Sequence, residues 1–372
     1  MSEYTQARLA RLQKAICASS NKLDALLVVK PTNVTYLSGF TGDSTYLLVF
    51  PNSAVLLSDS RYTIQLYEEA PEIPSQIRDT QTSLLSLAQI MVAEQTDGGK
   101  FRLGIESDGM TFKDFSEYQE KLNSDDLEVV PVAGAVEKLR AVKDKYEILQ
   151  TREAVRIAQK AYRMIMAGLT PKMTEWEIAV EIEYQMRKMG AKNAAFPTIV
   201  GVGPRAALPH AVPGKAAVEE SDLLLIDWGA DINGYKSDYT RTAVTGKLTA
   251  KFKKIYSIVR EAQQSAIAAI KPGVKCSEID AIARNTIKKA GYGKNFGHGL
   301  GHSVGLDIHE SPAFSPKNET ILQPGMILTV EPGIYLEDWG GIRIEDDILV
   351  TKDSCEVITS GLSSLLDDMI FN

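Results

Sequence analysis

Two segments that read as β-hairpins constrain this chain most, because both arms of each carry acidic residues. The first is LLLIDWGADINGYKSDYTRT, residues 223–242, and its Asn233-Gly234 pair predicts a two-residue turn. With that turn, the alternation of side chains along a strand puts Asp227 and Asp238 on one face. The two carboxylates then become diagonal neighbours, roughly 7–8 Å apart at the backbone.

A second hairpin of the same kind is predicted for MILTVEPGIYLEDWGGIRIEDD, residues 326–347. A three-residue loop at 337–339 would place Glu331 directly opposite Glu345, with Arg343 on the face of Glu345. Acidic residues on a hairpin are often only solvated, and that interpretation stays open for either hairpin alone. Together, however, the hairpins would gather four carboxylates, and like charges this close repel each other unless a cation lies between them.

Three of the four histidines in the chain fall within one glycine-rich stretch, FGHGLGHSVGLDIHESP, residues 296–312. The interspersed glycines oppose a helix. We therefore expect a loop that leads into a short strand, with His298, His302 and His309 in separate roles as metal ligand and proton donors. The fourth histidine, His210, lies in FPTIVGVGPRAALPHAVPG, which we predict to be a functional loop.

Other interpretations of the histidine-rich stretch are weaker. Gly301-x-Ser303-x-Gly305 matches the G-x-S-x-G turn of serine hydrolases, but the only downstream histidine, His309, is too close in sequence to act as the triad base. The spacing of the glycines does not fit the G-x-G-x-x-G loop of dinucleotide-binding proteins. Histidines buried only for packing would hardly be so clustered among glycines.

The carboxylates and one imidazole together suit a pair of divalent cations, because two such ions balance four negative ligands. Hard oxygen donors with one nitrogen favour Mn²⁺, with Co²⁺ or Zn²⁺ as alternatives. The three cysteines are Cys17, Cys276 and Cys355, which form no C-x-x-C pair, so a thiolate zinc site is not expected. Paired metals can activate a water molecule and stabilise a tetrahedral transition state, which predicts a hydrolase.

Length and charge set the wider frame. At 372 residues the chain exceeds one ordinary core, so two domains are expected. Alternating strand-like and helix-like segments up to residue 134 predict an α/β domain. Apolar periodicity predicts a helical region from Val136 to Met166, and a capping box at Thr174–Glu177 predicts the start of the next helix. The net charge of −7 argues against nucleic acid and anionic membrane partners, and no apolar run is long enough to span a membrane. Scattered cysteines and the lack of a secretion signal predict a cytoplasmic protein.

The hairpin and histidine blocks resemble the signature segments of the pita-bread metallopeptidases, and within them the proline-specific branch of Xaa-Pro aminopeptidases and Xaa-Pro dipeptidases. The resemblance covers about residues 136–372, and NVTYLSGFTGDSTYLLVF and SDSRYTIQ extend it to the N-terminal segment. It implies an α/β (α+β) protein with a smaller N-terminal α/β domain, residues 1–134, and a C-terminal pita-bread catalytic domain, residues 135–372.

The resemblance also implies which residues bind metal. The five implied ligands are Asp227, Asp238, His302, Glu331 and Glu345. Asp227 would bind one ion, and His302 with Glu331 would bind the other. Asp238 and Glu345 would bridge the two ions.

Further roles follow from the same resemblance. His210 and His309 would hold the substrate and stabilise the tetrahedral intermediate. His298 would lie near the metals and contact the substrate without binding metal. Glu331 would also accept a proton during catalysis, and Arg343 would orient Glu345 from behind.

The implied activity is hydrolysis of the bond between an N-terminal residue and a following proline in short peptides. An aminopeptidase is the preferred interpretation, because no arginine that could bind a substrate's C-terminal carboxylate follows the HESP segment at 309–312. An Xaa-Pro dipeptidase is the alternative, and a non-catalytic peptide- or protein-binding member of the fold is a remote one. Methionine aminopeptidases share the ligand plan but usually lack such an N-terminal domain. Homologues commonly dimerise, so a homodimer is expected.

Overall fold

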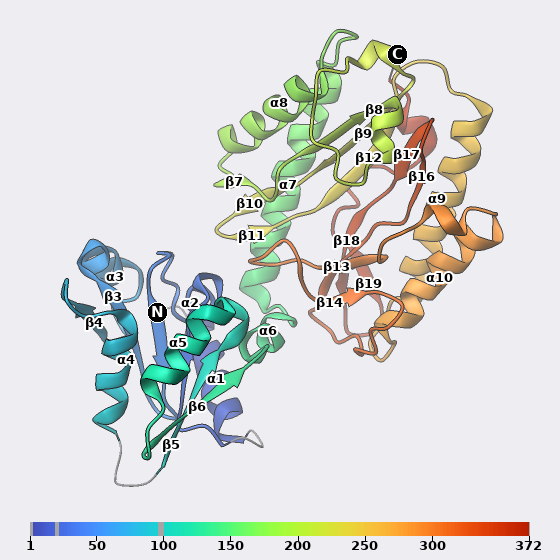
Figure 1. Cartoon of the computed structure of the whole chain (residues 1–372). Coiled ribbons are helices and arrows are strands. Elements are labelled where there is room, and N and C mark those ends of the chain that lie inside the picture. The colour runs from blue at the N-terminus through green and yellow to red at the C-terminus, as the bar shows by residue number, and fades with distance from the viewer. Residues whose placement is uncertain (1–2, 19–21, 96–99, 372) are drawn as a thin grey trace. The chain divides into compact units, whose positions relative to one another are not determined.

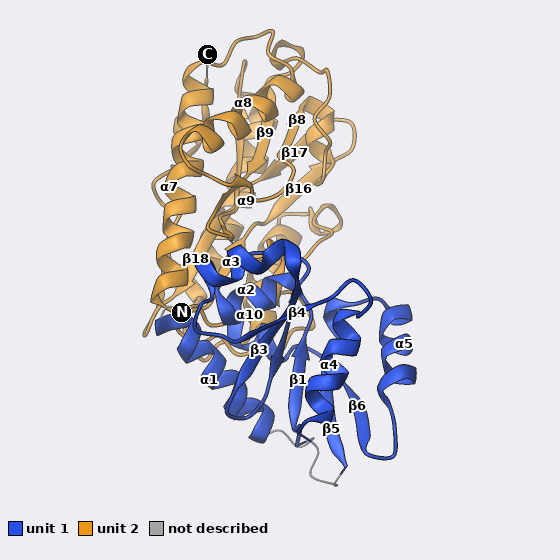
Figure 2. Ribbon diagram, turned by 90° about the vertical axis from the view of Figure 1, so that its left-hand side faces the viewer, with its two compact units in different colours: residues 1–140 blue, residues 141–372 orange. Residues whose placement is uncertain are grey.

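Figure 1 shows the computed structural model of the chain, which describes residues 3–18, 22–95 and 100–371. The chain divides into two compact units, residues 1–140 and 141–372 (Figure 2). The boundary expected from the sequence lies ahead of helix α6 (Ala135–Arg140), which this division places in the first unit. Within the described ranges, no helix is both long and apolar enough to cross a membrane.

The first unit is built on one six-stranded mixed sheet. Across the sheet its strands are β4 (Ser75–Arg78), β3 (Ala54–Asp59), β2 (Tyr46–Val49), β1 (Ala25–Val28), β5 (Phe101–Glu106) and β6 (Leu127–Val132). Strands β1, β5 and β6 are parallel, whereas β1, β2 and β3 form an antiparallel meander. The helices of this unit are α1 (Glu3–Ala18), α2 (Pro31–Ser38), α3 (Thr63–Glu69), α4 (Leu84–Ala93), α5 (Phe112–Leu122) and α6. Side chains of α4 and α5 pack on one face of the sheet.

The second unit contains four long helices, and two of them show how local sequence sets a helix boundary. They are α7 (Lys145–Ala167), α8 (Glu175–Lys188), α9 (Ala250–Ala269) and α10 (Cys276–Lys289). The capping box predicted for α8 is present, because Thr174 and Glu177 each accept a hydrogen bond from the other's backbone N–H. The helical region predicted as continuous from residue 136 is broken, because Asp144 caps α7 through its own box with Glu147.

The strands of the second unit lie in four small sheets, ordered β12-β9-β8, β11-β10-β7, β14-β13-β15-β18-β19 and β16-β17. The bounds are β7 (Asn193–Ala194), β8 (Ile199–Val202), β9 (Leu223–Trp228), β10 (Ala230–Ile232), β11 (Tyr235–Lys236), β12 (Tyr239–Val244), β13 (Gly301–Ser303), β14 (Glu310–Phe314), β15 (Ile327–Val330), β16 (Gly333–Leu336), β17 (Gly340–Arg343), β18 (Asp346–Val350) and β19 (Cys355–Val357). Short 3₁₀ helices occur in both units: η1 (Ser60–Tyr62) and η2 (Ser107–Gly109) in the first, and η3 (Gly203–Ala207), η4 (Val218–Glu220), η5 (Gly293–Asn295) and η6 (Leu366–Met369) in the second.

One segment expected to be entirely loop contains a strand. Residues 196–214 were predicted as a loop from their glycines and prolines, yet β8 lies within them and pairs with β9. The reason is burial: Val200 is fully buried and Val202 nearly so, and pairing satisfies their backbone groups. Residues 196–198 and the part that follows η3, which carries His210, are loop.

Both acidic hairpins keep the register that the sequence predicts. In the first, Ile232 pairs with Tyr235 across a turn in which Asn233 and Gly234 have positive φ angles of 52° and 88°. The same register continues outward, where Asp227 pairs with Thr240 on β12.

The second hairpin has the predicted loop at 337–339. Leu336 pairs with Gly340 on one side of it, and Val330 pairs with Asp346 farther out. Continuity between these two pairs places Glu331 opposite Glu345.

Helix pairs flank the hairpin strands, α7 and α8 on one side and α9 and α10 on the other (Figure 1). Strand β9 is buried on both faces as a result: Leu224 and Ile226 join the core with α7 and α8, whereas Leu223 and Leu225 join the core with α9 and α10. Alternation puts Asp227 on the face of Leu225. A strand with no solvent-exposed face therefore carries a carboxylate into the interior.

Candidate metal centre

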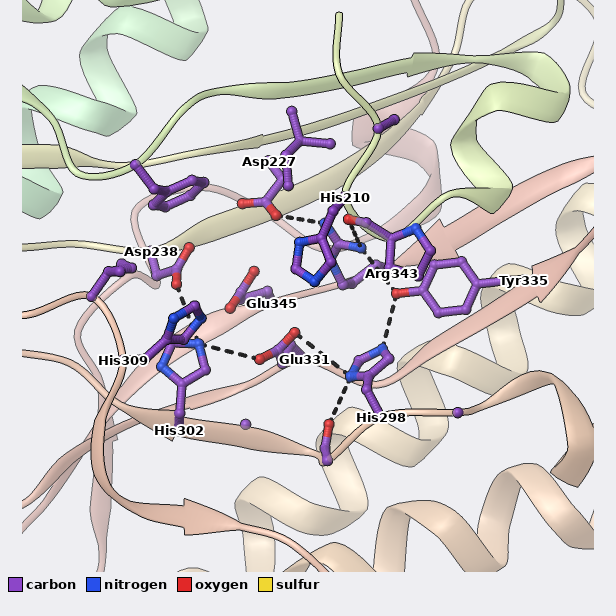
Figure 3. A pocket seen from close by; sticks show the side chains of 18 of the residues that line it. His210, Asp227, Asp238, His298, His302, His309, Glu331, Tyr335, Arg343 and Glu345 are labelled. Atoms are coloured by element: carbon purple, nitrogen blue, oxygen red, sulfur yellow. Dashed lines mark hydrogen bonds and ion pairs between the residues drawn. The ribbon is translucent and has the colours of Figure 1, made fainter. Parts of the chain in front are cut away.

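A cavity of about 1070 Å³ opens in the second unit, and all nine residues singled out from the sequence line it. They are His210, Asp227, Asp238, His298, His302, His309, Glu331, Arg343 and Glu345. Figure 3 shows their side chains converging from both hairpins, from the histidine-rich stretch and from the loop that follows η3. Segments separated by more than a hundred residues in sequence thus contribute to one site.

The first hairpin supplies two buried aspartates. Arg343 Nη2 donates to Asp227 Oδ2 at 2.5 Å, whereas Asp227 Oδ1 makes no hydrogen bond to the described part of the protein. The backbone N–H of Asp238 donates to Asp347 Oδ2 at 3.0 Å, which holds the end of β12 against β18. A buried carboxylate oxygen without a donor is rare, and a cation in the cavity would satisfy it.

The second hairpin supplies two glutamates. Glu345 Oε2 accepts a hydrogen bond from Thr240 Oγ1 at 2.6 Å, and an isolated bridge joins the two residues' backbones. Glu331 Oε1 accepts from Thr329 Oγ1 at 3.3 Å. Each glutamate is therefore oriented by a threonine hydroxyl and keeps oxygens directed at the cavity.

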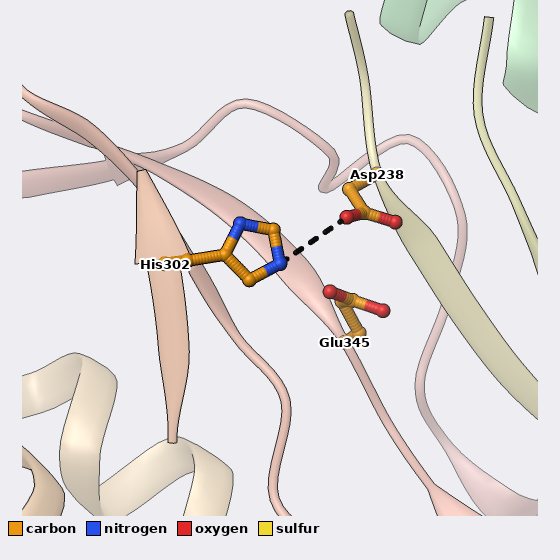
Figure 4. Close-up of side chains that lie close together, drawn as sticks. All are labelled: Asp238, His302 and Glu345. Carbon is orange, nitrogen blue, oxygen red and sulfur yellow. Dashed lines mark ion pairs between the residues drawn. The ribbon is translucent and has the colours of Figure 1, made fainter. Parts of the chain in front are cut away.

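His302 on β13 completes the group. Its Nε2 lies 3.7 Å from Asp238 Oδ2 and 3.5 Å from Glu331 Oε1. Its Nδ1 lies 3.2 Å from the carbonyl oxygen of Ser303, so Nδ1 carries the proton and Nε2 presents its lone pair. One ligand atom each from Asp238, His302 and Glu345 lie within 4.8 Å of one another (Figure 4).

Electrostatics disfavours this group in the absence of a cation. Burial, followed by the charge of Glu345, raises the pKa of Asp238 well above its ordinary value. Burial, followed by the charge of Glu331, does the same to the pKa of Glu345. The pKa of Glu331 rises to about 8, mainly from burial. Burial also lowers the pKa of His302 to about 4, so its imidazole is neutral and able to bind metal. Three buried carboxylates, the partly buried Glu331 and a neutral imidazole fit hard divalent cations.

Behind the carboxylates lies a chain of hydrogen bonds that sequence reasoning described only in part. Arg343 Nη1 donates to Tyr335 Oη at 2.9 Å, and Tyr335 Oη lies 3.0 Å from His298 Nε2. His298 Nδ1 donates to the carbonyl oxygen of Gly299 at 2.7 Å, so Nε2 accepts from the tyrosine. Burial lowers the pKa of His298 to about 4, consistent with a neutral ring in this chain.

Arg343 contacts Asp227 directly. Its Nε donates to Thr240 Oγ1 at 2.9 Å, and it reaches Glu345 only through that hydroxyl. This arginine therefore orients one carboxylate by an ion pair and another through a shared threonine. Because Arg343 contacts residues of both hairpins, its removal is expected to disturb both.

The remaining two histidines face open cavity. His210 follows η3 and is exposed, as is His309. The ring of His309 packs edge-on against that of His302, with centroids 4.4 Å apart. Both imidazoles can therefore contact a bound substrate.

Three residues of the site escaped sequence reasoning, although the strand alternation could have found them. Tyr335 lies two places beyond Gly333 and four beyond Glu331, so it shares their face. Asp347 lies two places beyond Glu345, and Thr240 two places beyond Asp238, with the same consequence. All three hold other site residues through hydrogen bonds.

The serine-hydrolase interpretation is contradicted by the position of Ser303. Its side chain is fully buried, and its Oγ donates to the carbonyl oxygen of Ile327 at 2.8 Å. A nucleophile must reach the substrate, and this hydroxyl cannot.

Comparison with known proteins agrees with this geometry. Residues 150–352 match the metallopeptidase family M24, and residues 8–142 match the creatinase/prolidase N-terminal domain. An Xaa-Pro dipeptidase of Pyrococcus furiosus is 36% identical, over 96% of this chain and 99% of the relative.

Two solved structures extend the likeness to the fold. One is an Xaa-Pro dipeptidase from Bacillus anthracis, with a TM-score of 0.90 and 37% identity over 98% of this chain and 99% of that one. The other is an X-Pro aminopeptidase from Thermotoga maritima, with a TM-score of 0.84 and 35% identity over 94% and 97%. With the buried carboxylate–imidazole cluster, these matches show that the chain belongs to metallopeptidase family M24, as a metallo-exopeptidase of the Xaa-Pro peptidase branch with the pita-bread fold.

Proposed function

We propose that this protein is an Xaa-Pro dipeptidase that hydrolyses dipeptides ending in proline. The observation that carries the proposal is the cluster of four carboxylates and His302 in the cavity. The chain that holds this cluster matches 99% of the length of the P. furiosus Xaa-Pro dipeptidase. This reverses the preference stated from the sequence, where the aminopeptidase came first.

The choice between the two activities depends on what binds the substrate's C-terminal carboxylate. Apart from the histidines, Lys294 on η5 and Arg343 are the basic side chains that line the cavity in the described structure. Arg343 is buried and already bonded to Asp227. Lys294 is exposed, and no hydrogen bond or ion pair engages it within the described residues, so its ammonium is available to a carboxylate.

One observation still favours the aminopeptidase. Ala313, which follows the HESP segment, lines the cavity and offers no charge. The apolar lining nearby, which includes Phe196, Ile308 and Phe314, suits a proline ring in either activity. The aminopeptidase therefore stays the second candidate.

The same proposal assigns two divalent ions, Mn²⁺ foremost, to Asp227, Asp238, His302, Glu331 and Glu345. When bound, such ions polarise a carbonyl and lower the pKa of water. Glu331 would accept the proton of the attacking water, being a carboxylate beside the reacting atoms. His210 and His309 would donate hydrogen bonds to the oxygen that becomes negative in the transition state. The backbone of a substrate proline has no N–H and a fixed φ, which is why a shaped apolar wall helps to recognise it.

The decisive experiment compares Ala-Pro with Ala-Pro-Ala and with Ala-Pro amide, using protein reconstituted with Mn²⁺. Preference for Ala-Pro over both other peptides is expected. Preference for the tripeptide would establish the aminopeptidase instead, and cleavage of none would refute both. Light scattering of the same sample tests the homodimer, which we also propose.

A further inference from the structure

A buried lysine outside the cavity contacts the segment that carries two of its histidines. The side chain of Lys143, just ahead of α7, is fully buried. Its ammonium donates to Ser303 Oγ at 2.7 Å and to Glu310 Oε2 at 3.1 Å. Its own backbone N–H donates to the carbonyl oxygen of Gly325 at 2.9 Å, so the lysine is anchored on both ends.

The two partners of Lys143 face each other at an irregular point of the sheet. His302 pairs with Ala313, but the next residue, Ser303, pairs with Glu310, so β14 contains two extra residues there. Backbone pairing alone specifies such a bulge weakly, because the ladder is interrupted. The ammonium joins the two strands exactly where their hydrogen bonding is interrupted, and the hydroxyl of Ser303 extends the link to Ile327 on β15.

The rest of the segment leaves space for this ion pair. Glu310 Oε1 accepts from the backbone N–H of Asp307 at 3.1 Å. A Cβ placed on Gly305 would lie 2.6 Å from the same oxygen, so a larger residue there would displace the Glu310 carboxylate. Two residues of the Gly-x-Ser-x-Gly pattern, Ser303 and Gly305, therefore contact or make room for a buried lysine–glutamate pair, which gives them a role that the catalytic interpretation did not.

The histidines of the site are the chain neighbours of the two clamped residues. His302 precedes Ser303, and His309 precedes Glu310. Because neighbouring residues of a strand point to opposite faces, Ser303 turns toward Lys143 while His302 turns toward the cavity. The 4.4 Å separation between the two imidazole rings thus depends on how Ser303 and Glu310 are held.

We propose that Lys143 is a positioning residue, which fixes His302 and His309 relative to each other by clamping Ser303 to Glu310. The proposal rests on the proposed function for the roles of these histidines, but the clamp itself does not depend on the substrate. A buried ion pair seldom stabilises a fold more than an apolar replacement would. Its use here is therefore to set geometry, and residues that orient metal ligands typically change metal affinity or activity by about 10- to 100-fold when replaced.

The test separates an effect on site geometry from an effect on stability. It removes the Lys143 clamp in two ways, one that leaves the charge of Glu310 in place and one that removes that charge as well. Lys143→Met leaves Glu310 buried without its partner, and the double variant Lys143→Met/Glu310→Gln restores neutrality without restoring the clamp. Ser303→Ala removes one link and keeps the ion pair. Ile182→Ala, a core truncation in α8 at a residue that does not line the cavity, is the control for lost stability alone.

Four quantities are measured on each protein: the urea midpoint, the affinity for Co²⁺, the visible absorption spectrum of bound Co²⁺, and the kcat for Ala-Pro. We expect Lys143→Met to lose stability, and the double variant to recover the midpoint while its Co²⁺ affinity stays on the order of tenfold weaker. The double variant's Co²⁺ spectrum is expected to differ from that of the wild type, and its kcat to stay low. Ser303→Ala is expected to change the spectrum in the same direction, and Ile182→Ala to lower only the midpoint.

Two results would overturn the proposal. One is a double variant, or Ser303→Ala if the lysine variants do not fold, that matches the wild type in Co²⁺ affinity, spectrum and kcat. The other is a control that changes the spectrum as much as the clamp variants do. If the wild type cleaves no Xaa-Pro peptide, the proposed function fails, and the Co²⁺ measurements still decide the clamp.

Discussion

The burial of Glu331 in the metal-free site predicts an unusual pH dependence for the protein. Burial raises the pKa of Glu331 from 4.5 to about 8. A carboxyl whose pKa is higher in the folded state than in the unfolded state favours folding only while it is protonated. The contribution of Glu331 to stability is therefore expected to fall as the pH rises from about 4.5 to about 8.

The size of this effect follows from the same value. At about 1.4 kcal/mol for each pKa unit, the rise corresponds to an upper limit of about 5 kcal/mol above pH 8. Glu331→Gln removes the charge but keeps an oxygen that can accept the hydrogen bond from Thr329. The metal-free variant should therefore exceed the metal-free wild type in stability by a few kcal/mol at pH 9 and match it near pH 4.

The assay is urea unfolding of chelator-treated protein from pH 4 to pH 9. Glu337→Gln, which replaces an exposed glutamate in the loop of the same hairpin, is the matched control and should follow the wild type at every pH. Excess Mn²⁺ should reverse the order, because each occupied site adds about 2.7 kcal/mol at a hundredfold excess over Kd. A Glu331→Gln variant no more stable than wild type at pH 9 would refute the reasoning.

Other predictions concern single side chains. Lys294→Met should lower kcat/KM for Ala-Pro by about tenfold and leave the slower hydrolysis of Ala-Pro amide unchanged, since only the dipeptide offers a carboxylate. Lys289→Met, outside the cavity, is the control. An equal loss on both substrates would contradict the assignment of Lys294 to the carboxylate. Trp228→Phe should cost about 1–3 kcal/mol in urea unfolding, because Trp228 Nε1 donates to the carbonyl oxygen of Ala158 and the ring stacks between two tyrosines; an unchanged midpoint would contradict this. A serine-directed fluorophosphonate should leave hydrolysis unchanged and add no mass to the buried Ser303. Labelling of Ser303 would support the serine-hydrolase interpretation instead.

Much of the site was predictable because its residues follow local rules. The Asn233-Gly234 turn sets a register, and the alternation of side chains then carries Asp227 and Asp238 to one face. The same arithmetic places Glu331 opposite Glu345. These relations depend only on neighbours across a hairpin.

Relations between distant segments could not be predicted in this way. The sequence pairs Arg343 with Glu345 on its own strand, but in the structure its guanidinium binds Asp227, which lies 116 residues away. Nothing local indicates that Lys143 reaches Ser303, because that contact spans 160 residues. The break of the predicted helix ahead of Asp144 also follows from a cap that the apolar periodicity does not register.

The central claim is that five residues hold two divalent ions, and metal stoichiometry tests it most directly. Metal-free wild type, His302→Ala and the control Ile182→Ala would be dialysed against Mn²⁺ and analysed by mass spectrometry for bound metal. The account predicts two ions for each chain of the wild type and the control, and fewer for His302→Ala. Wild-type protein that cleaves Ala-Pro with no bound metal, or an undiminished count in His302→Ala, would contradict it.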